Sequence, residues 1–404
     1  MKKAASFYEV RDMLLAHVQT TGKEIIKLDA CGGRVLGQDV IARENVPPFD
    51  RSPYDGYAFC AADSKMASKE NPVTLKIIEE IPAGGISHYA VTEGCAVKIL
   101  TGAPIPEGAD TVTPYEITEF TDETVTIFRE NVSGSNIVRA GEDIKKGDIL
   151  AQSGTIIDSG LAGTLAGQNI EYPTVYSIPK IGIISTGSEL LDIGSEPELG
   201  KIYNSNQYTL SVAVQQLGCE AVVLGVVKDS ADQICQLIQE GLATCDMVLM
   251  TGGVSVGDYD LTPAAMEMAG IQILQRGVDL KPGMACAFGV KDGKLVCGLS
   301  GNPASAITNF HAIVSPLIRK LSGCNEFIST EFQVELLDAF NKKSRGTRLL
   351  RGKMEIVQGK VGVRISKEQG NAVLSSTIGN NMMVIVPPGS GILEEGAKLK
   401  GFLI

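Results

Sequence analysis

Near the N-terminus, the hydrophobic pattern is that of an amphipathic helix. Phe7, Val10 and Leu14 recur at intervals of three and four residues, which places them on one side of an α-helix. Ser6 comes just before this run and Glu9 stands three residues after Ser6, a spacing typical of a capping box. The pattern therefore predicts a helix that begins after Ser6 and packs against a core with its apolar face.

Between residues 27 and 155 the pattern changes to short runs rich in β-branched residues. Such runs occur at 73–78, 97–100 and 125–128, and turns containing Gly or Pro separate them. A short helix is expected next, over residues 158–168. We therefore expect a small β-rich region in the first half of the chain.

From Lys180 to Gly323, fully apolar strands alternate with amphipathic helices. Strands that are apolar on both sides predict a parallel sheet covered by helices on both faces, so we expect all of these strands to be buried. We expect Asn206 to cap the first helix, and Ser230 with Gln233 to form a capping box on the second. The predicted strands are 181–185, 221–227, 247–250 and 295–299, and the other predicted helices begin at Thr262 and Pro303.

After Gly323 the chain returns to short strands, for example 384–386, which is followed by Pro387 and Pro388. This pattern predicts a small β-barrel or sandwich. The chain has 404 residues, too many for one compact core, so two to four domains are expected. The predicted fold class is a multidomain α/β plus β protein whose central domain is a three-layer parallel sheet.

Charge and cysteine content exclude several functions. The formal net charge is -11, which argues against a nucleic-acid binder because such proteins need a basic face. Nine cysteines are scattered without a CxxC pair, which favours a reducing, cytoplasmic location over a disulfide framework or a zinc site. No run of about 18 apolar residues is present, so no membrane span is expected.

Three loops follow predicted parallel strands at their carboxyl ends, where open α/β sheets bind ligands. The loops cover residues 186–189, 251–260 and 300–305. Gly252 and Gly253 allow backbone N–H groups to approach a phosphate closely, although ordinary turn glycines are the alternative interpretation. Three such loops at one edge of a sheet favour a site for a phosphate ligand.

The same loops carry a helix start and several carboxylates. Asn302 as N-cap and Pro303 at the first helical position place a helix N-terminus at this edge. Glu189, Asp258 and Asp260 are unexpected beside an anion unless a hard cation bridges them. Mg²⁺ does this at phosphate sites with one or two carboxylates and several waters. The residues therefore predict a phosphate site that uses Mg²⁺.

Six blocks of the chain resemble, in order, the signatures of the molybdopterin molybdenumtransferase family, which includes bacterial MoeA and the C-terminal domain of gephyrin. Taken without the others, the first block is also consistent with a surface loop that holds an internal Arg–Asp pair. The ordered set spans most of the chain and is a strong signal. The blocks are FDRSPYDGYA at 49–58, LTGAPIPEGAD at 100–110, RAGEDI at 139–144, STGSEL at 185–190, GGVSVGD at 252–258 and GNP at 301–303.

The resemblance implies a four-part fold with a molybdopterin adenylyltransferase-like central domain and a C-terminal β-barrel. It also implies an elongated homodimer whose active site lies near the subunit boundary. The implied domains are a discontinuous N-terminal helical and linker domain (1–26, about 45–60 and 140–178), a small β-rich domain (27–44 and 61–139), the molybdopterin-binding α/β domain (179–324) and the barrel (325–404).

The resemblance further implies the reaction. The family inserts molybdate into adenylylated molybdopterin, with divalent-cation-dependent release of AMP, to give molybdenum cofactor. Both reactants held in one dry cleft react as if intramolecularly. Small-molecule substrates, a molybdopterin adenylyltransferase and apo-molybdoenzymes are the implied partners, whereas nucleic acid and membrane are not.

Site residues are carried over position by position from the resemblance. Asp229 is also expected at the sheet edge because it directly follows strand 221–227. For Asp143 an ordinary turn aspartate, and for Arg351 a barrel-surface arginine, are the alternatives. The implied catalytic residues are Asp55, Thr101, Glu189, Asp229 and Asp260, of which Glu189, Asp229 and Asp260 are the candidates for Mg²⁺. The implied substrate-binding residues are Arg139, Asp143, Thr186, Gly187, Gly252, Gly253, Ser255, Asp258, Lys281, Pro282, Gly301, Asn302, Pro303, Ser305 and Arg351.

Four positions depart from the family pattern. Arg51 stands where Asn is frequent and Tyr54 where Met is frequent; Met284 replaces a usual second Lys, and Ser300 a usual Pro. The loss of a lysine removes positive charge from the expected anion pocket, and Arg51 of a facing subunit is one possible replacement. These changes leave open a preference for tungstate. Another molybdopterin-nucleotide enzyme and a non-enzymatic scaffold are the remaining alternatives.

Overall fold

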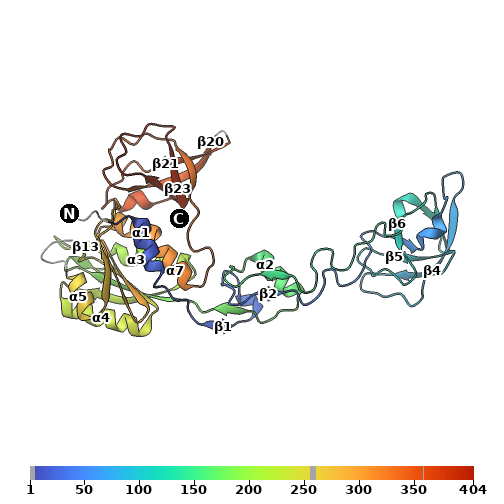
Figure 1. Ribbon diagram of the computed structural model, residues 1–404, viewed down its shortest axis with the longest axis horizontal. Coiled ribbons are helices and arrows are strands. Elements are labelled where there is room, and N and C mark those ends of the chain that lie inside the picture. The colour runs from blue at the N-terminus through green and yellow to red at the C-terminus, as the bar shows by residue number, and fades with distance from the viewer. Residues whose placement is uncertain (1–4, 255–260, 358) are drawn as a thin grey trace. The chain divides into compact units, whose positions relative to one another are not determined.

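The computed structural model describes residues 5–254, 261–357 and 359–404. These residues form two compact units (Figure 1). Unit 1 comprises Met1–Gln38, Ser153–Ala166 and Ile170–Ile404, and unit 2 comprises Asp39–Gln152 and Gly167–Asn169. The division is coarser than the four expected domains, whose boundaries stay a prediction. In the described part of the chain, no helix is long and apolar enough to cross a membrane.

A six-stranded sheet forms the centre of unit 1, in the order β14-β11-β15-β18-β17-β16. The first four strands are parallel, as expected, and β17 and β16 add an antiparallel edge. The strands are β11 (Lys180–Thr186), β14 (Glu220–Val227), β15 (Met247–Thr251), β16 (Gln272–Arg276), β17 (Ala287–Lys291) and β18 (Lys294–Leu299).

Strand β14 was expected to be buried and is not. Every third residue along it is exposed, and Val223 retains 48% of its accessible surface. The physical reason is its place at the edge of the sheet, where β11 is its only partner strand among the described residues. Edge and central strands of equal apolarity cannot be distinguished by pattern alone.

Helices cover both faces of this sheet, as the apolar pattern predicted. One face packs against α1, α3 and the α6–α7 region, and the other against α4 and α5 (Figure 1). The helices are α1 (Phe7–Leu15), α3 (Ser205–Gln216), α4 (Ala231–Thr244), α5 (Thr262–Met268), α6 (Pro303–Asn309), the π-helix η4 (Phe310–Val314) and α7 (Ser315–Leu321).

Helix starts were predicted with mixed success. The capping box of Ser6 and Glu9 is present, because each side chain bonds to the other's backbone N–H. The first helix of the α/β region is capped by Asn204, which accepts from the Gln207 N–H, and not by Asn206. Ser230 is the N-cap residue of α4 but makes no side-chain cap bond, so the expected capping box there is wrong.

A closed barrel of order β19-β21-β20-β22-β23 completes unit 1. Its residues Leu349, Met383 and Ile385 join the same hydrophobic core as α1 and the sheet, so the barrel and the α/β region share a core. The barrel strands are β19 (Phe332–Leu336), β20 (Arg348–Val357), β21 (Lys360–Ile365), β22 (Met382–Val386) and β23 (Lys398–Leu403), and the 3₁₀ helix η5 (Leu374–Thr377) lies between β21 and β22 in sequence.

Smaller elements of unit 1 include two short strand pairs. β1 pairs with β10, and β12 pairs with β13. Helix α2 begins after Asp158, whose carboxylate accepts from the Leu161 N–H. The bounds are β1 (Lys23–Ile25), η1 (Leu28–Ala30), α2 (Ser159–Gly167), β10 (Thr174–Tyr176), β12 (Leu190–Leu191) and β13 (Ile202–Tyr203).

Unit 2 is built on another six-stranded sheet, in the order β6-β3-β5-β4-β8-β7. Its two faces bury separate apolar clusters. The β-rich pattern of this region was therefore interpreted correctly. The elements are β2 (Val40–Ile41), β3 (Gly56–Phe59), η2 (Ala61–Ser64), β4 (Val73–Ile81), β5 (Cys95–Ile99), β6 (Thr111–Pro114), η3 (Tyr115–Ile117), β7 (Thr118–Phe120), β8 (Thr124–Ile127) and β9 (Ile149–Ala151).

Candidate active site

The carboxyl ends of β14, β11, β15 and β18 form one rim in unit 1, because neighbouring parallel strands end at the same edge of a sheet. The rim loops contact one another directly. The Gly252 N–H donates to the Leu299 carbonyl at 3.1 Å, and Thr186 Oγ1 donates to the Thr251 carbonyl at 3.2 Å. The structure thus brings the first parts of the three expected loops together.

Glycine is required at the centre of this rim. Gly252 has φ +99° and Gly253 has φ +62°, in the region that side chains rarely adopt. A side chain at Gly252 would also collide with the Thr186 carbonyl oxygen, and the Cα of Gly252 lies 3.5 Å from an ideal Cβ at Gly301. The loops after β11, β15 and β18 therefore pack at backbone distance.

Asn206 has a role that the sequence interpretation missed. Its side chain donates to the Gly301 carbonyl at 2.8 Å, and so holds the rim loop that follows β18. Asn302 is the N-cap residue of α6, but its side chain makes no cap bond. The Ala304 N–H at this helix start donates instead to the Asn371 carbonyl of the C-terminal region.

Two of the predicted metal-handling carboxylates lie in adjoining rim loops. Asp229 accepts from the Ser188 hydroxyl at 2.8 Å and from the Ser188 N–H at 3.3 Å. The carboxylate of Glu189 lies over Gly187, because an ideal Cβ there would be 2.5 Å from Glu189 Oε2. Both carboxylate residues are exposed, and Lys201 donates to the Ser188 carbonyl beside them at 2.7 Å.

The metal prediction is not complete in the structure. Within residues 5–254, 261–357 and 359–404, no three His, Cys, Asp or Glu side chains lie close enough to hold a metal ion. Asp260, the third predicted ligand, lies outside the described residues, as do Ser255 and Asp258. Glu189 and Asp229 fit the sparse carboxylate set that Mg²⁺ uses beside substrate phosphates and water.

A cavity of about 650 Å³ adjoins the rim, lined by both the α/β region and the C-terminal barrel region. It contains four residues of the predicted set: Lys281, Pro282, Asn302 and Ser305. Ser300 and Asn302 belong to the rim loop and also line this cavity. The cavity is therefore continuous with the rim through a single loop.

Backbone pairing fixes the floor of this cavity. The Lys281 N–H donates to the Thr347 carbonyl at 2.9 Å, and the Leu349 N–H donates to the Lys281 carbonyl at 3.0 Å. Gly283 has φ +112° and packs against Asn309, whose amide donates to the Gly283 carbonyl at 2.9 Å. Lys281 is thereby held beside the start of β20, although its own side chain is exposed.

Arg351 is buried, so the alternative of a barrel-surface arginine is wrong. It is 1% exposed and does not line the 650 Å³ cavity. Its backbone N–H donates to Gln369, its Nε to Ser376 and its Nη2 to the Gly370 carbonyl. Burial lowers its pKa to about 10. Arg351 thus holds the stretch Gln369–Gly370, which does line the cavity.

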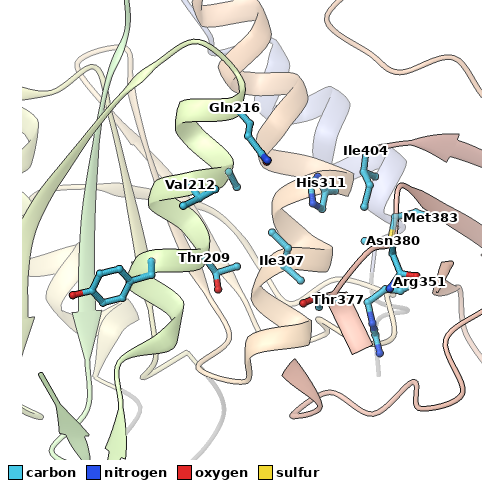
Figure 2. Close-up of a pocket in the computed structure, with 12 residues that line it drawn as sticks. Thr209, Val212, Gln216, Ile307, His311, Arg351, Thr377, Asn380, Met383 and Ile404 are labelled. Carbon is cyan, nitrogen blue, oxygen red and sulfur yellow. The ribbon is translucent and has the colours of Figure 1, made fainter. Parts of the chain in front are cut away.

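Figure 2 shows a second cavity, of about 340 Å³, where Arg351 and Met383 of the barrel face α3 and His311. Nη1 of Arg351 is buried and has no hydrogen-bond partner within residues 5–254, 261–357 and 359–404. Burial lowers the pKa of His311 to about 4, so this imidazole is neutral at pH 7. None of the other predicted site residues lines this second cavity.

Unit 2 brings Asp55 and Thr101 together. β3 pairs antiparallel with β5, with Gly56 opposite Ile99, so the residues next to this pair meet at the sheet end. Thr101 donates to Asp55 Oδ1 from its N–H at 2.7 Å and from its hydroxyl at 2.8 Å. These bonds, the backbone bond first, lower the pKa of Asp55 below its ordinary value. An exposed, firmly oriented carboxylate results.

The other predicted residues of unit 2 lie near the loop that precedes Asp55 in sequence. Arg139 Nη1 donates to Asp50 at 2.6 Å, and the Ala140 N–H donates to the other oxygen of the same carboxylate at 2.8 Å. The Asp143 N–H donates to the Val46 carbonyl at 3.0 Å. This contact uses only the backbone of Asp143, and its side chain is exposed.

Comparison with known proteins decides the family. A model of the MoeA N-terminal region (domains I and II) matches residues 5–168, and a model of a probable molybdopterin binding domain matches residues 182–320. The molybdopterin molybdenumtransferase of Staphylococcus epidermidis is 34% identical over 387 residues, which are 96% of this chain and 92% of that protein. The chain belongs to the molybdopterin molybdenumtransferase family.

Solved structures agree with this assignment. The molybdopterin biosynthesis MoeA protein of Pyrococcus horikoshii OT3 matches with a TM-score of 0.86, 30% identity and full coverage of both chains. A molybdenum cofactor biosynthesis protein of Pyrococcus furiosus shares the fold at a TM-score of 0.61 and 20% identity. The predictions of family, fold class and a transferase of molybdenum cofactor biosynthesis are confirmed.

Proposed function

We propose that this chain inserts molybdate into adenylylated molybdopterin and releases AMP, giving molybdenum cofactor. The observation that carries the proposal is the continuity of a glycine-lined rim with a basic cavity through the loop of Ser300 and Asn302. A reaction between a nucleotide-activated pterin and an oxyanion needs two adjoining subsites of this kind. Held at contact distance, two reactants gain effective concentrations unreachable in solution.

The rim is the proposed nucleotide subsite. In this proposal Gly187, Gly252, Gly253 and Gly301 allow the rim loops to pack closely, which gathers backbone N–H groups at one edge of the sheet where a phosphate would bind. Thr186 is buried and its hydroxyl donates to the Thr251 carbonyl, so it connects the ends of β11 and β15 at the rim. In this proposal the predicted substrate residues Ser255 and Asp258 belong to the same subsite by sequence.

The adjoining cavity is the proposed oxyanion subsite. Lys281 brings positive charge, Ser305 brings a buried hydroxyl, and Asn302, next to the predicted residue Pro303, connects the subsite to the rim. Arg351 supports this subsite by holding Gln369 and Gly370 in its wall. A dianion such as molybdate or tungstate matches the positive charge of this cavity, because fixed positive groups attract it.

Mg²⁺ is the proposed cation, held by Glu189 and Asp229, and by Asp260 as the third sequence candidate. When bound, it would neutralise negative charge on the phosphoanhydride. Ser188 orients Asp229 through two hydrogen bonds, so this carboxylate presents a defined face to the rim. Lys201 lies beside the same loop.

We further propose that the protein acts as a cytoplasmic homodimer. Asp55 and Thr101, with Arg139 and Asp143, are then the residues that unit 2 contributes to the reaction, Asp55 as the principal catalytic carboxylate. An exposed carboxylate oriented by two donors, with no ion-pair partner among the described residues, supports this role. The proposed partners are a molybdopterin adenylyltransferase upstream and apo-molybdoenzymes that receive the product.

A turnover assay with the full chain tests the function. Purified protein is mixed with adenylylated molybdopterin, Mg²⁺ and molybdate, and AMP release and reconstitution of an apo-molybdoenzyme are followed. We expect AMP release that depends on molybdate and yields active enzyme. Tungstate in place of molybdate measures the metal preference. Tight nucleotide binding without AMP release with either oxyanion would contradict the proposal.

Glu189→Gln and Asp229→Asn test the cation assignment. Each change removes one negative charge at nearly constant shape, so we expect half-maximal AMP release to need at least about tenfold more Mg²⁺. Saturating Mg²⁺ should restore part of the rate. Glu198→Gln, a change of an exposed carboxylate between β12 and β13, is the matched control and should leave the Mg²⁺ dependence unchanged. An unaltered Mg²⁺ dependence in both site variants would remove these residues from cation binding.

A further inference from the structure

Arg348 is a buried cation in the wall of the 650 Å³ cavity, and no sequence motif pointed to it. It is 7% exposed and stands at the first position of β20. Its Nε donates to Ser344 Oγ at 3.1 Å, and its guanidinium carbon lies 5.2 Å from the centre of the Phe340 ring. These contacts orient the side chain.

The charge of Arg348 has no protein counter-charge in the described part of the chain. None of the ion pairs found there includes Arg348. Asp279 lines the same cavity, but its Oδ2 accepts from the Thr347 N–H and is not within ion-pair distance of Arg348. A buried charge is costly unless an opposite charge compensates it. Arg348 is therefore poised for an anion that enters the cavity.

The backbone places Arg348 next to Lys281. The two residues form a parallel β-bridge, fixed by the bonds from Lys281 to Thr347 and from Leu349 to Lys281. The loop that contains Lys281 and the barrel strand β20 thus place two positively charged side chains, Lys281 and Arg348, in the lining of one cavity. Lys281 is exposed and hydrated, whereas Arg348 is desolvated by burial, which also lowers its pKa.

Among the described residues that line the cavity, no other buried side chain carries a positive charge. Met284 lines it and is 68% exposed but is uncharged, and Lys342 is an exposed lysine free to extend into water. A guanidinium presents a rigid fork of N–H donors that matches two oxygens of an oxyanion. Arg348 is thus the cation with the most defined position in this wall.

We propose that Arg348 binds the oxyanion substrate in this cavity, together with Lys281, and sets its affinity for a tetrahedral dianion. The inference rests on the proposed function and deepens it by naming the group that recognises molybdate. Arg348 acts on the oxyanion and not on the nucleotide, because the glycine rim that we assign to the nucleotide lies on the α/β side of the connecting loop.

The test measures equilibrium molybdate binding to the full chain by calorimetry, beside separate binding of adenylylated molybdopterin. Arg348→Gln removes the charge and should weaken molybdate binding at least about tenfold, the usual scale for a lost charged hydrogen bond. Arg348→Lys keeps the positive charge without the guanidinium fork, so its molybdate affinity should lie between those of wild type and Arg348→Gln. Nucleotide binding should stay unchanged in both. Lys360→Gln removes one charge elsewhere on the barrel and should behave as wild type.

A second substitution separates recognition from a structural role. Met284→Lys, introduced into the Arg348→Gln protein, returns a cation to the same cavity and should restore molybdate affinity by several-fold. A merely structural arginine would not be rescued in this way. If Arg348→Gln does not fold, Arg348→Lys decides: unchanged molybdate affinity in a folded Arg348→Lys and in its Met284→Lys derivative would overturn the proposal.

Failure of this inference differs from failure of the proposed function. A wild-type protein that releases AMP with molybdate, while Arg348→Gln binds molybdate as tightly as wild type, overturns the role of Arg348 alone. A wild-type protein without molybdate-dependent AMP release overturns the proposed function. A matched loss of molybdate and nucleotide binding in Arg348→Gln would also overturn the inference, because Arg348 would then act on the fold.

Discussion

Replacing Asp55 by alanine is expected to abolish molybdenum insertion while the protein stays folded. Thr101 holds one oxygen of the carboxylate with two hydrogen bonds, which leaves the other free to act. Loss of a positioned carboxylate that takes part in the reaction lowers turnover by about 10²–10⁴-fold. The side chain is exposed, so the protein should stay folded, with only a small drop in melting temperature from the two lost hydrogen bonds. AMP release and reconstitution of an apo-molybdoenzyme are the measurements.

Matched variants divide this effect into charge and orientation. Asp55→Asn keeps the shape and should be nearly as inactive as Asp55→Ala. Thr101→Val removes one of the two donors, keeps the backbone N–H, and should cost about tenfold. Asp122→Asn neutralises an exposed carboxylate in the turn between β7 and β8 and should have full activity. Unfolding of Asp55→Ala would show instead that Asp55 is structural.

The pH dependence of Asp55 follows from its lowered pKa. Because the carboxylate is stabilised in the folded state, it stays ionised as the pH falls from 7 to the ordinary aspartate value near 4. Its favourable contacts with Thr101 are complete above the unfolded-state pKa and are lost only as the pH falls through the folded-state value. We therefore expect no loss of activity from Asp55 between pH 7 and pH 5.

Mixed dimers test whether the carboxylate of one protomer serves the site of its partner. Asp55→Ala and Glu189→Ala proteins are each expected to be inactive. If their residues act across the subunit boundary, a mixed dimer has one complete site, and random mixing returns about a quarter of wild-type activity. If both residues act within one protomer, the mixture stays inactive.

Gly252→Ala is expected to disable the rim and lower stability together. The residue has φ +99°, and its new Cβ would collide with the carbonyl oxygen and the hydroxyl of Thr186. Strained backbone and overpacking together cost about 2–5 kcal/mol. The loop must then move from Gly301, so adenylylated molybdopterin should bind at least about tenfold more weakly. Calorimetric binding and denaturant unfolding measure the two effects.

Gly194→Ala separates the collision from the backbone strain. Gly194 has φ +91°, but an ideal Cβ there meets nothing within 4 Å. It should lose only the strain, about 1–2 kcal/mol, and should bind the nucleotide normally. Equal losses in the two alanine variants, or normal nucleotide binding by Gly252→Ala, would show that the tight packing of the rim is not needed.

Local patterns predicted local structure well. Ser6 and Glu9 form their capping box because both partners lie within one helical turn, and strands β11, β15 and β18 formed where short apolar runs predicted them. The cap of α3 was misplaced by two residues, since Asn204 and Asn206 are equally good caps. The pairing of β13 with β12 ends at Tyr203 and decides in favour of Asn204.

The candidate site was predictable where a motif stays close to its strand. Glu189, Asp229 and Gly252 follow parallel strands, so the common edge of the sheet brings their loops together. For Arg351 the sequence left two alternatives, a substrate ligand and a barrel-surface arginine; its burial excludes the surface position, and its role as a ligand stays a prediction. The first five residues of β20, which include Arg351, are buried. The Arg351 side chain is therefore enclosed and is bonded to Ser376 and Gly370, and its backbone N–H is bonded to Gln369.

By itself, the sequence determined the parallel strands and main helices of the α/β region, the family and the loops of the rim, because these depend on contacts within a few residues or on ordered motifs. Only the tertiary structure decided that β14 is an edge strand, that Asp55 faces Thr101, and that Arg348 lies beside Lys281. Strand order, register and the burial of a charge depend on segments far apart in the chain. No local pattern carries that information, since the free energy of each contact arises only when the whole core has assembled.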